Sequence, residues 1–208
     1  MNNKKQIWFG SDYHFHHGNI IKYCSRPFNN INEMNNTIIN NHNSVVKPDD
    51  DFYFLGDFCF HNQYEAECIL ERLNGNKYFI IGNHDNSIMD SKRFNIIGYS
   101  YLLNYKNYPK IYISHCCSRL WIDSHKGSWH LFGHHHGTLT TYNMSIDVGV
   151  DSNDLPKKYT PVSIDEIQKI MTRKIDALKE MNRYKIGYRS LKEKPYYDQD
   201  DVSYFQKP

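Results

Sequence analysis

Three short apolar runs in the first half of the chain are each followed by glycine and, within two residues, by a potential metal ligand. The runs span residues 7–9, 52–55 and 78–81, and their length and aromatic or β-branched content predict β-strands. Helical patterns lie between them at 31–45 and 66–73, and Asn74-Gly75 supplies a stop signal after the second. This alternation predicts an α/β sheet, in which ligands gather beyond the carboxyl ends of the strands.

The second half of the chain has a different pattern. Apolar runs at 111–113, 129–132 and 144–148 have few helical patterns between them, which predicts a second sheet with hairpin-like links. Ser163 and Glu166 have the spacing of a capping box, and an apolar stripe continues to Leu178, so we expect one long helix near 163–181. Residues 182–208 are charged and tyrosine-rich without a clear period. We therefore expect one domain at 1–181 and a C-terminal tail at 182–208.

Composition narrows the possible partners and compartment. A net charge of +2 over 208 residues is too small for nucleic-acid wrapping or a membrane-binding face, so any affinity for phosphate must be local. The five cysteines show no C-x-x-C spacing, which favours reduced thiols. We find no export signal and no apolar stretch long enough to span a membrane. We expect a cytoplasmic protein, or one in the host cytoplasm if the source is viral.

Five blocks of metal-ligand residue types lie at the ends of the predicted strands. Aspartate, histidine and asparagine together supply the ligands that two adjacent divalent cations need, including a carboxylate that can bridge them. In Gly133-His134-His135-His136, imidazoles stand at positions i and i+2 in a strand that runs into a turn. The other four blocks are Ser11-Asp12-Tyr13-His14, Gly56-Asp57, Gly82-Asn83-His84-Asp85 and Ser114-His115.

In this order the blocks read D-x-H, G-D, G-N-H-D, a lone histidine and G-H-x-H, and they resemble the calcineurin-like metallophosphoesterase superfamily over residues 7–136. The resemblance implies a four-layer αββα sandwich of two mixed β-sheets flanked by helices. It also implies two divalent ions, drawn from Mn, Fe, Zn, Co and Ni, with a bridging hydroxide that attacks phosphorus. By this resemblance the first ion is held by Asp12, His14, Asp57 and His136, and the second by Asp57, Asn83, His115 and His134.

The same resemblance assigns His84 as the residue that meets the substrate phosphate and acts as general acid, with Asp85 orienting it. The superfamily's Ser/Thr protein phosphatases carry G-D-x-V-D-R-G, and this chain lacks that arginine. The segments at 15–20, 25–28 and 127–134 are more similar to small prokaryotic and phage-type phosphoesterases. The chain departs from that group at His16, where a glycine is more usual.

Three further residues are predicted to contact the phosphate or sugar of the substrate. His17, Asn19 and Arg26 lie in loops near the first ligand block, and arginine suits bidentate phosphate recognition. We expect packing or surface roles for His42, His61, His130 and His135. Cys116 and Cys117 are expected to be reduced bystanders, because thiolates favour closed structural zinc sites.

The expected function is hydrolysis of a small, nucleotide-type phosphodiester, with cyclic nucleotides among the candidates. The loops around the predicted centre are short, which predicts an open site, and the low net charge disfavours extended DNA binding. A phosphomonoesterase or phosphatase, and a nuclease that acts on short nucleic acid, remain alternatives because selectivity depends on those loops. A non-catalytic scaffold is the rival class, and the intact set of ligands argues against it.

Overall fold

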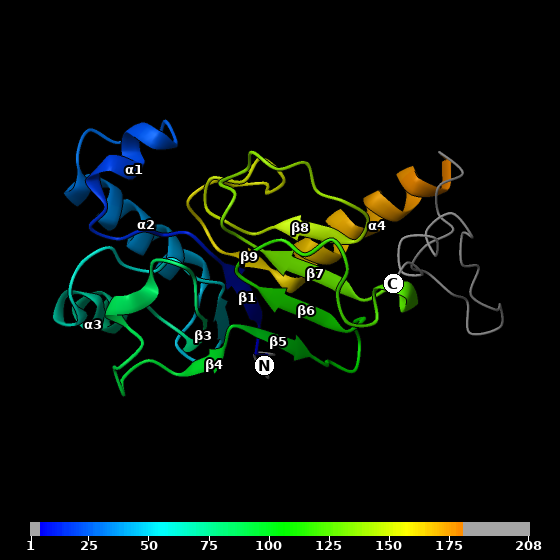
Figure 1. Ribbon diagram of the computed structural model, residues 1–208, viewed down its shortest axis with the longest axis horizontal. Helices are drawn as coiled ribbons and strands as arrows, with labels where there is room; N and C mark the ends of the chain where they lie inside the picture. Colours follow the sequence, from blue (N-terminus) through cyan, green and yellow to red (C-terminus); the bar gives the residue numbers. More distant parts are fainter. Residues whose placement is uncertain (1–4, 181–208) are drawn as a thin grey trace, which may run out of the picture.

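The computed structural model describes residues 5–180 as two facing β-sheets with helices packed around them (Figure 1). The first sheet has the order β4-β3-β2-β1-β9. Strands β1 to β4 are parallel, and β9 pairs antiparallel with β1. This sheet is therefore mixed. Its strands are β1 (Ile7–Gly10), β2 (Asp51–Phe54), β3 (Asn76–Ile80), β4 (Ile96–Gly98) and β9 (Val162–Ser163).

The second sheet has the order β5-β6-β7-β8 and is also mixed. Strand β5 pairs antiparallel with β6, whereas β6, β7 and β8 run parallel. The expectation of hairpin-like links among these three strands is wrong. Parallel neighbours need a crossover connection, which runs back from the end of one strand to the edge of the sheet where the next strand begins. The strands are β5 (Ser100–Leu103), β6 (Ile111–Ser114), β7 (Trp129–Phe132) and β8 (Ser145–Asp147), and the short 3₁₀ helix η2 (Ser124–Lys126) lies in the β6–β7 connection.

Three helices, α1 (Gly18–Tyr23), α2 (Ile31–Val45) and α3 (Gln63–Arg72), lie on the side of the first sheet that faces away from the second (Figure 1). Helix α2 begins after Asn30, whose side-chain oxygen accepts a hydrogen bond from the Glu33 N–H at 3.0 Å. Asn62 caps α3 in the same way. Each cap satisfies a backbone donor that the first helical turn leaves unpaired. Apolar side chains of α2 and α3 form one core with the sheet: Met34, Ile38, Ala66 and Ile69 pack with Phe52, Phe54 and Phe79.

The second core lies between the two sheets. In β2, Phe52 and Phe54 point towards the helices, while Tyr53 and the following Leu55 point towards the second sheet. A strand buried on both faces reads as a continuous apolar run, which explains why 52–55 shows no polar alternation. The opposing strands contribute Ile113, Leu131 and Ile146. The predicted α/β class, with two mixed sheets and flanking helices, is confirmed.

The C-terminal helix α4 (Ile164–Glu180) joins the core between the sheets through Ile167 and Met171, which are fully buried. Its predicted capping box is present: the Glu166 N–H donates to Ser163 Oγ at 3.2 Å, and the Ser163 N–H donates to the Glu166 carboxylate at 3.4 Å. The predicted tail at 182–208 lies outside the described residues. Within residues 5–180, no helix is long and apolar enough to cross a membrane.

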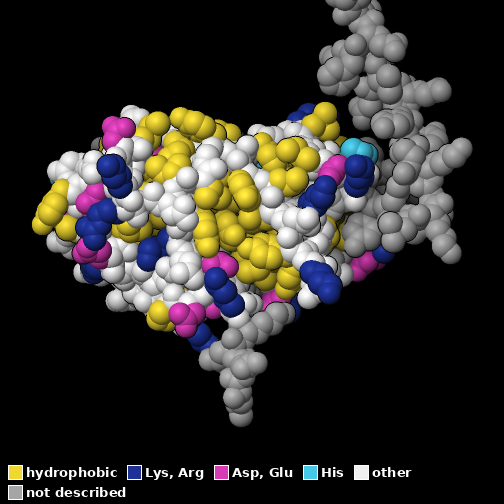
Figure 2. Space-filling view, turned by 90° about the horizontal axis from the view of Figure 1, so that it is seen from below, with side chains coloured by type: hydrophobic (Ala, Val, Ile, Leu, Met, Phe, Trp, Pro, Cys, Tyr) yellow, Lys and Arg dark blue, Asp and Glu magenta, His cyan; other side chains and the backbone are white. Residues whose placement is uncertain are grey.

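Several short elements carried no clear pattern in the sequence, namely α1, β4, β5 and β9. Strands β4 and β5 are edge strands of the two sheets and follow one another in the chain. Figure 2 views the molecule from the side on which these strands lie in Figure 1, and hydrophobic side chains gather near the middle of this face. Tyr99, just before β5, and Tyr101, within it, are exposed.

Replacing Ile167 by alanine tests the packing of α4. Because this side chain is fully buried between α4 and the sheets, we expect the free energy of unfolding to fall by about 2–5 kcal/mol. Gln168→Ala is the matched control, since Gln168 is exposed on the same helix, and its effect should stay within about 0.5 kcal/mol. Chemical denaturation of both variants measures the difference. Equal stabilities would show that α4 does not belong to the core.

Candidate metal centre

The five ligand blocks meet at one end of the two sheets, in the loops after β1, β2, β3, β6 and β7. Backbone hydrogen bonds join these loops directly. The Asp12 N–H donates to the Gly56 carbonyl at 3.0 Å, and the His14 N–H donates to the Asp57 carbonyl at 3.0 Å. The Gly133 N–H donates to the His115 carbonyl at 2.9 Å, which ties the ends of β6 and β7 together. The positions of the ligands are thus set by the sheets.

Asp57 lies at the middle of the cluster. Its Oδ2 atom is 3.4 Å from His14 Nε2 and 3.4 Å from His115 Nε2, so one carboxylate oxygen faces an imidazole on each side. Its Oδ1 atom accepts a hydrogen bond from the His84 N–H at 2.9 Å. Asp57 therefore lies between two groups of side chains that could each hold a metal ion.

On one side of Asp57, atoms of Asp12, His14 and His136 lie within 4.8 Å of one another and can hold a metal ion. His14 Nε2 is buried and makes no hydrogen bond within the described residues. His136 Nδ1 is 2.7 Å from an oxygen of Asp151, so Nε2 is the ring nitrogen that can meet a metal ion on the other side. A carboxylate behind a histidine fixes the ring and its tautomer in this way at many metal sites.

On the other side, atoms of Asp57, His115 and His134 form a second group of the same size. The His115 Nδ1 atom is 2.8 Å from the Leu55 carbonyl and donates to it, so Nε2 points inward and presents a lone pair when the imidazole is neutral. Asn83 Oδ1 lies 2.9 Å from this Nε2, and His134 Nδ1 lies 3.2 Å from it. Several lone pairs thus converge on one point, and only a proton or a metal cation satisfies such an arrangement.

The backbone at the predicted ligands is strained. Asp12, His14, Asp57, His134 and His136 have φ angles of 60°, 51°, 61°, 71° and 48°. Each residue in the left-handed region costs roughly 1–3 kcal/mol unless it is glycine, and such residues cluster at functional sites. Five of the seven predicted ligands adopt this conformation, so the fold maintains a costly geometry at the positions that the sequence singled out.

Glycines next to the ligands leave room for the carboxylates. A Cβ atom on Gly133 would overlap Ser11 Oγ and Asp12 Oδ2, and one on Gly82 would overlap Asp57. A Cβ on Gly56, whose φ is +97°, would lie 2.5 Å from His115 Nδ1. The G-D, G-N-H-D and G-H-x-H patterns therefore have a steric cause, because any other residue would displace a ligand.

Burial and charge set the ionisation of the cluster. Burial raises the pKa of Asp12 to about 7, although the imidazoles of His115 and His136 oppose the shift. Burial lowers the pKa of His14 to about 3, which favours the neutral imidazole that binds metals. For His115, burial lowers the pKa, but Asp57 and Asp12 outweigh it and raise the pKa to about 9. The charged forms of His115 and of the two buried carboxylates thus stabilise one another.

His84 follows Asn83 on the open side of the cluster. Its side chain is exposed, and its ring centroid lies 5.7 Å from that of His14. The expectation that Asp85 orients the His84 ring is wrong. Asp85 is fully buried, and its carboxylate accepts hydrogen bonds from the N–H groups of Asp57, Phe58 and Gly82 at 2.7–2.8 Å. Asp85 fixes the Asp57 loop and leaves the His84 ring free to face a ligand.

The predicted phosphate contact of Arg26 is also wrong, because its five N–H groups are used within the protein. Nε and Nη2 bind both oxygens of Asp151 at 3.0 and 2.7 Å, and Nη2 also donates to the Asp12 carbonyl at 2.8 Å. Nη1 donates to the Tyr13 carbonyl at 2.9 Å and to Met34 Sδ at 3.4 Å. Arg26 therefore holds the backbone of the Asp12 loop and positions Asp151.

Asp151 is a site residue that the sequence analysis missed. Each of the five ligand blocks follows an apolar run, and Asp151 likewise follows the run at 144–148. A search for potential ligands after every such run would therefore have found it. Cys24, His136 and Asp151 form a third group of potential ligands. Hydrogen bonds from Arg26 and His136 already occupy both oxygens of Asp151, so we assign Asp151 to orienting His136.

The other predicted residues divide into those near the cluster and those away from it. The His17 ring centroid lies 5.5 Å from that of His14, whereas Asn19 is exposed on α1 and no described contact joins it to the cluster. The packing roles of His42 and His130 are confirmed, since both are buried and their ring nitrogens lie within hydrogen-bonding distance of neighbouring groups. All five cysteines are free thiols.

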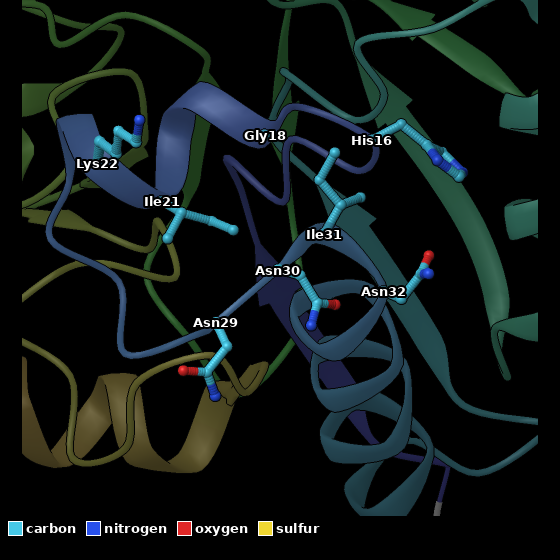
Figure 3. A pocket seen from close by; sticks show the side chains of 8 residues that line it. All are labelled: His16, Gly18, Ile21, Lys22, Asn29, Asn30, Ile31 and Asn32. Atoms are coloured by element: carbon cyan, nitrogen blue, oxygen red, sulfur yellow. The ribbon is translucent and has the colours of Figure 1, made fainter.

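A cavity of about 540 Å³ lies between α1 and the start of α2 (Figure 3). His16 belongs to its lining, together with Ile21 and Lys22 of α1 and residues 29–32. None of the predicted metal ligands lines it. We therefore treat this cavity as separate from the candidate metal centre.

The fold and cluster define a two-sheet α/β protein with a candidate metal centre at one end of its sheets. No family model matches the chain. The uncharacterized protein MJ1445 of Methanocaldococcus jannaschii is 37% identical over 178 residues, which cover 81% of this chain and 93% of MJ1445. The chain belongs to the same family as MJ1445. The crystal structure of AQ665 from Aquifex aeolicus, a protein of unknown function, matches with a TM-score of 0.59 and 26% identity, over 80% of this chain and 100% of that one.

Replacing Gly133 by alanine tests the steric cradle. Because the new Cβ would overlap Ser11 Oγ and Asp12 Oδ2, we expect the variant to fold but to lose most of its bound metal. Gly18→Ala is the control, since its Cβ would approach only the flexible end of Ile31 at 3.0 Å. Elemental analysis after reconstitution with Mn²⁺, together with circular dichroism, measures both effects. Full metal content in Gly133→Ala would contradict the assignment of Asp12.

Proposed function

We propose that this protein is a dinuclear metal-dependent phosphoesterase, and specifically a phosphodiesterase that acts on nucleotide-type substrates. We also propose that it is a calcineurin-like metallophosphoesterase, the superfamily whose resemblance gave the predicted ligand set. Two divalent ions, drawn from Mn, Fe, Zn, Co and Ni, suit a donor set of imidazole, carboxylate and amide oxygen.

The single observation that carries the proposal is the position of Asp57. One of its oxygens lies 3.4 Å from an imidazole nitrogen of each flanking group, and both groups can hold a cation. A lone structural metal would need only one such group, usually closed by four protein ligands. A shared carboxylate between two partly exposed groups is instead typical of centres that hydrolyse phosphate esters.

The side chains then have distinct roles. Bound divalent cations would supply Lewis acidity and an activated water at neutral pH. Asp57 joins the two halves of the centre, while Asp151 and the Leu55 carbonyl hold His136 and His115 in the tautomers that present Nε2. His84, exposed at the rim, donates a proton to the leaving oxygen of the substrate.

The charge of the site supports a diester over a monoester. A diester carries a single negative charge, whereas a monoester dianion carries two and gains more from a charge-assisted hydrogen bond to a cationic side chain. Arg26 contacts the loop that carries Asp12, and its donors are all engaged by the protein. Asn83 and His84 are exposed, so the site is open to a substrate with groups on both sides of the phosphorus.

Substitutions at Asp57 and His84 should differ in kind. Asp57→Asn removes the shared negative charge, so we expect loss of metal and of turnover together. His84→Ala should retain the metal and lose on the order of 10²- to 10⁴-fold in kcat, the usual scale of general acid–base assistance. His125→Ala, at an exposed histidine of η2, is the control. Near-normal kcat in metal-loaded His84→Ala would remove the general-acid assignment.

Substrate class is tested with the Mn²⁺-loaded protein on bis(p-nitrophenyl) phosphate and p-nitrophenyl phosphate. Because the donors of Arg26 are engaged within the protein, we expect a higher kcat/KM for the diester. A panel of cyclic nucleotides, dinucleotides, short oligonucleotides and phosphopeptides then locates the natural class. Exclusive cleavage of monoesters would contradict the phosphodiesterase proposal and favour a phosphatase. No cleavage of either ester would favour a non-catalytic scaffold.

A further inference from the structure

Four aromatic rings form a continuous wall on one side of the candidate metal centre. The ring centroid of His14 lies 5.5 Å from that of His17 and 5.7 Å from that of His84. Phe60 contacts both His17 and His84. Its ring stacks on His17, with ring centroids 4.1 Å apart and an interplanar angle of 14°, and its centroid lies 5.2 Å from that of His84. Phe60 therefore touches a neighbour of a predicted ligand and the predicted general acid at once.

Phe60 is not explained by the packing of the protein. Its exposed fraction is 45%, and it belongs to neither hydrophobic core of the described residues. Its backbone is nevertheless fixed, because the Phe60 N–H donates to the Phe15 carbonyl at 2.8 Å and Ser87 Oγ donates to the Cys59 carbonyl at 3.2 Å. The result is a flat apolar surface that is rigid and open to solvent at the rim of the site.

Tyr23 extends the same surface. Its ring meets His17 edge-on at 6.2 Å, and 73% of the residue is exposed. Tyr23 belongs to α1, whereas Phe60 precedes α3, so two separate segments of the chain bring exposed aromatic side chains to the same rim. Exposed aromatics that gather beside a polar site indicate a ligand with an aromatic group of its own.

The position of the surface indicates which part of a substrate it meets. In the proposed function, His84 contacts the phosphate ester, and Phe60 lies one ring beyond His84. In a nucleotide, a sugar separates the phosphate from the base. Phe60 contacts the far side of His84 from the metal ligands, so it is separated from the phosphate by about the width of a sugar. The base of a bound nucleotide would therefore lie against Phe60. Nucleobases stack on exposed aromatic side chains, and the gain is similar for every base because each has a π-face.

We propose that Phe60, stacked on His17, is a platform for the nucleobase of a nucleotide substrate. This inference rests on the proposed phosphodiesterase function and specifies its substrate. The phosphate binds at the metal centre and the base lies against the exposed face of Phe60. Because stacking does not read the hydrogen-bonding edge of the base, the platform accepts adenine and cytosine alike.

The test compares two ligands that differ only in the base. The Mn²⁺-loaded protein is titrated by calorimetry with the methylphosphinate analogue of adenosine 5′-(methyl phosphate), a singly charged and non-hydrolysable mimic of a diester, and with the corresponding analogue that has ribose in place of adenosine. We expect the adenosine compound to bind roughly 5- to 150-fold more tightly, the factor that corresponds to stacking of one base. The cytidine analogue should share this advantage. The quantity compared is the ratio of the Kd of the ribose analogue to the Kd of the nucleoside analogue. A variant that weakens the phosphate site changes both Kd values equally and leaves this ratio unchanged.

Three variants assign the advantage to the ring of Phe60. Phe60→Leu keeps an apolar side chain without a ring and should reduce the ratio to near one, whereas Phe60→Trp should retain it. Tyr101→Ala is the matched control, because Tyr101 has a similar exposed fraction of 48% but lies in the edge strand β5. That variant should leave the ratio unchanged.

The outcomes separate this inference from the proposed function. A ratio near one in the unmodified protein, or an unchanged ratio in Phe60→Leu, would overturn the platform. Tighter binding of phenyl phosphonate than of the adenosine analogue would assign the surface to a phosphoaryl group and also overturn it. Hydrolysis of bis(p-nitrophenyl) phosphate is measured on the same samples. A nucleoside advantage without hydrolysis would support the platform while contradicting the phosphodiesterase.

Discussion

The candidate metal centre depends on how the protein fixes the carboxylate of Asp57. The N–H groups of Asp57, Phe58 and Gly82 all bind the buried carboxylate of Asp85, which holds the loop after β2 against the loop after β3. Asp57 itself has a φ of 61°, and the space that its carboxylate occupies exists only because residue 82 has no side chain. The strain is sustained by hydrogen bonds from three backbone donors. From this position, Asp57 connects the two groups of potential ligands.

Much of the fold follows from the sequence, for reasons that can be identified. Strands β1, β2 and β3 contribute side chains to both cores, so residues 7–9, 52–55 and 78–81 read as uninterrupted apolar runs, and the capping box of α4 lies in consecutive residues at its start. The short elements were missed because β9 spans only Val162–Ser163 and β4 only Ile96–Gly98, too few residues to show a period. The direction of β7 and β8 was mispredicted, since it depends on crossover connections rather than on the strands.

The candidate site was predicted unevenly. The seven predicted ligands meet because each follows a strand, and parallel strands place their carboxyl ends at one edge. Side chains that act through a distant partner could not be assigned in this way. Arg26 and Asp151 are 125 residues apart, and only the folded chain shows that they bind one another rather than a substrate. Asp85 likewise serves the backbone of the neighbouring loop, a role that its place in G-N-H-D does not reveal.

The central claim is that Asp57 lies between two cations, and anomalous X-ray diffraction from crystals grown with Mn²⁺ tests it most directly. We expect two anomalous peaks that flank Asp57 Oδ2. One should lie among Asp12, His14 and His136, and the other beside His115 and His134. A single peak among Cys24, His136 and Asp151, or no peak near Asp57 in Mn²⁺-saturated crystals, would contradict the dinuclear centre.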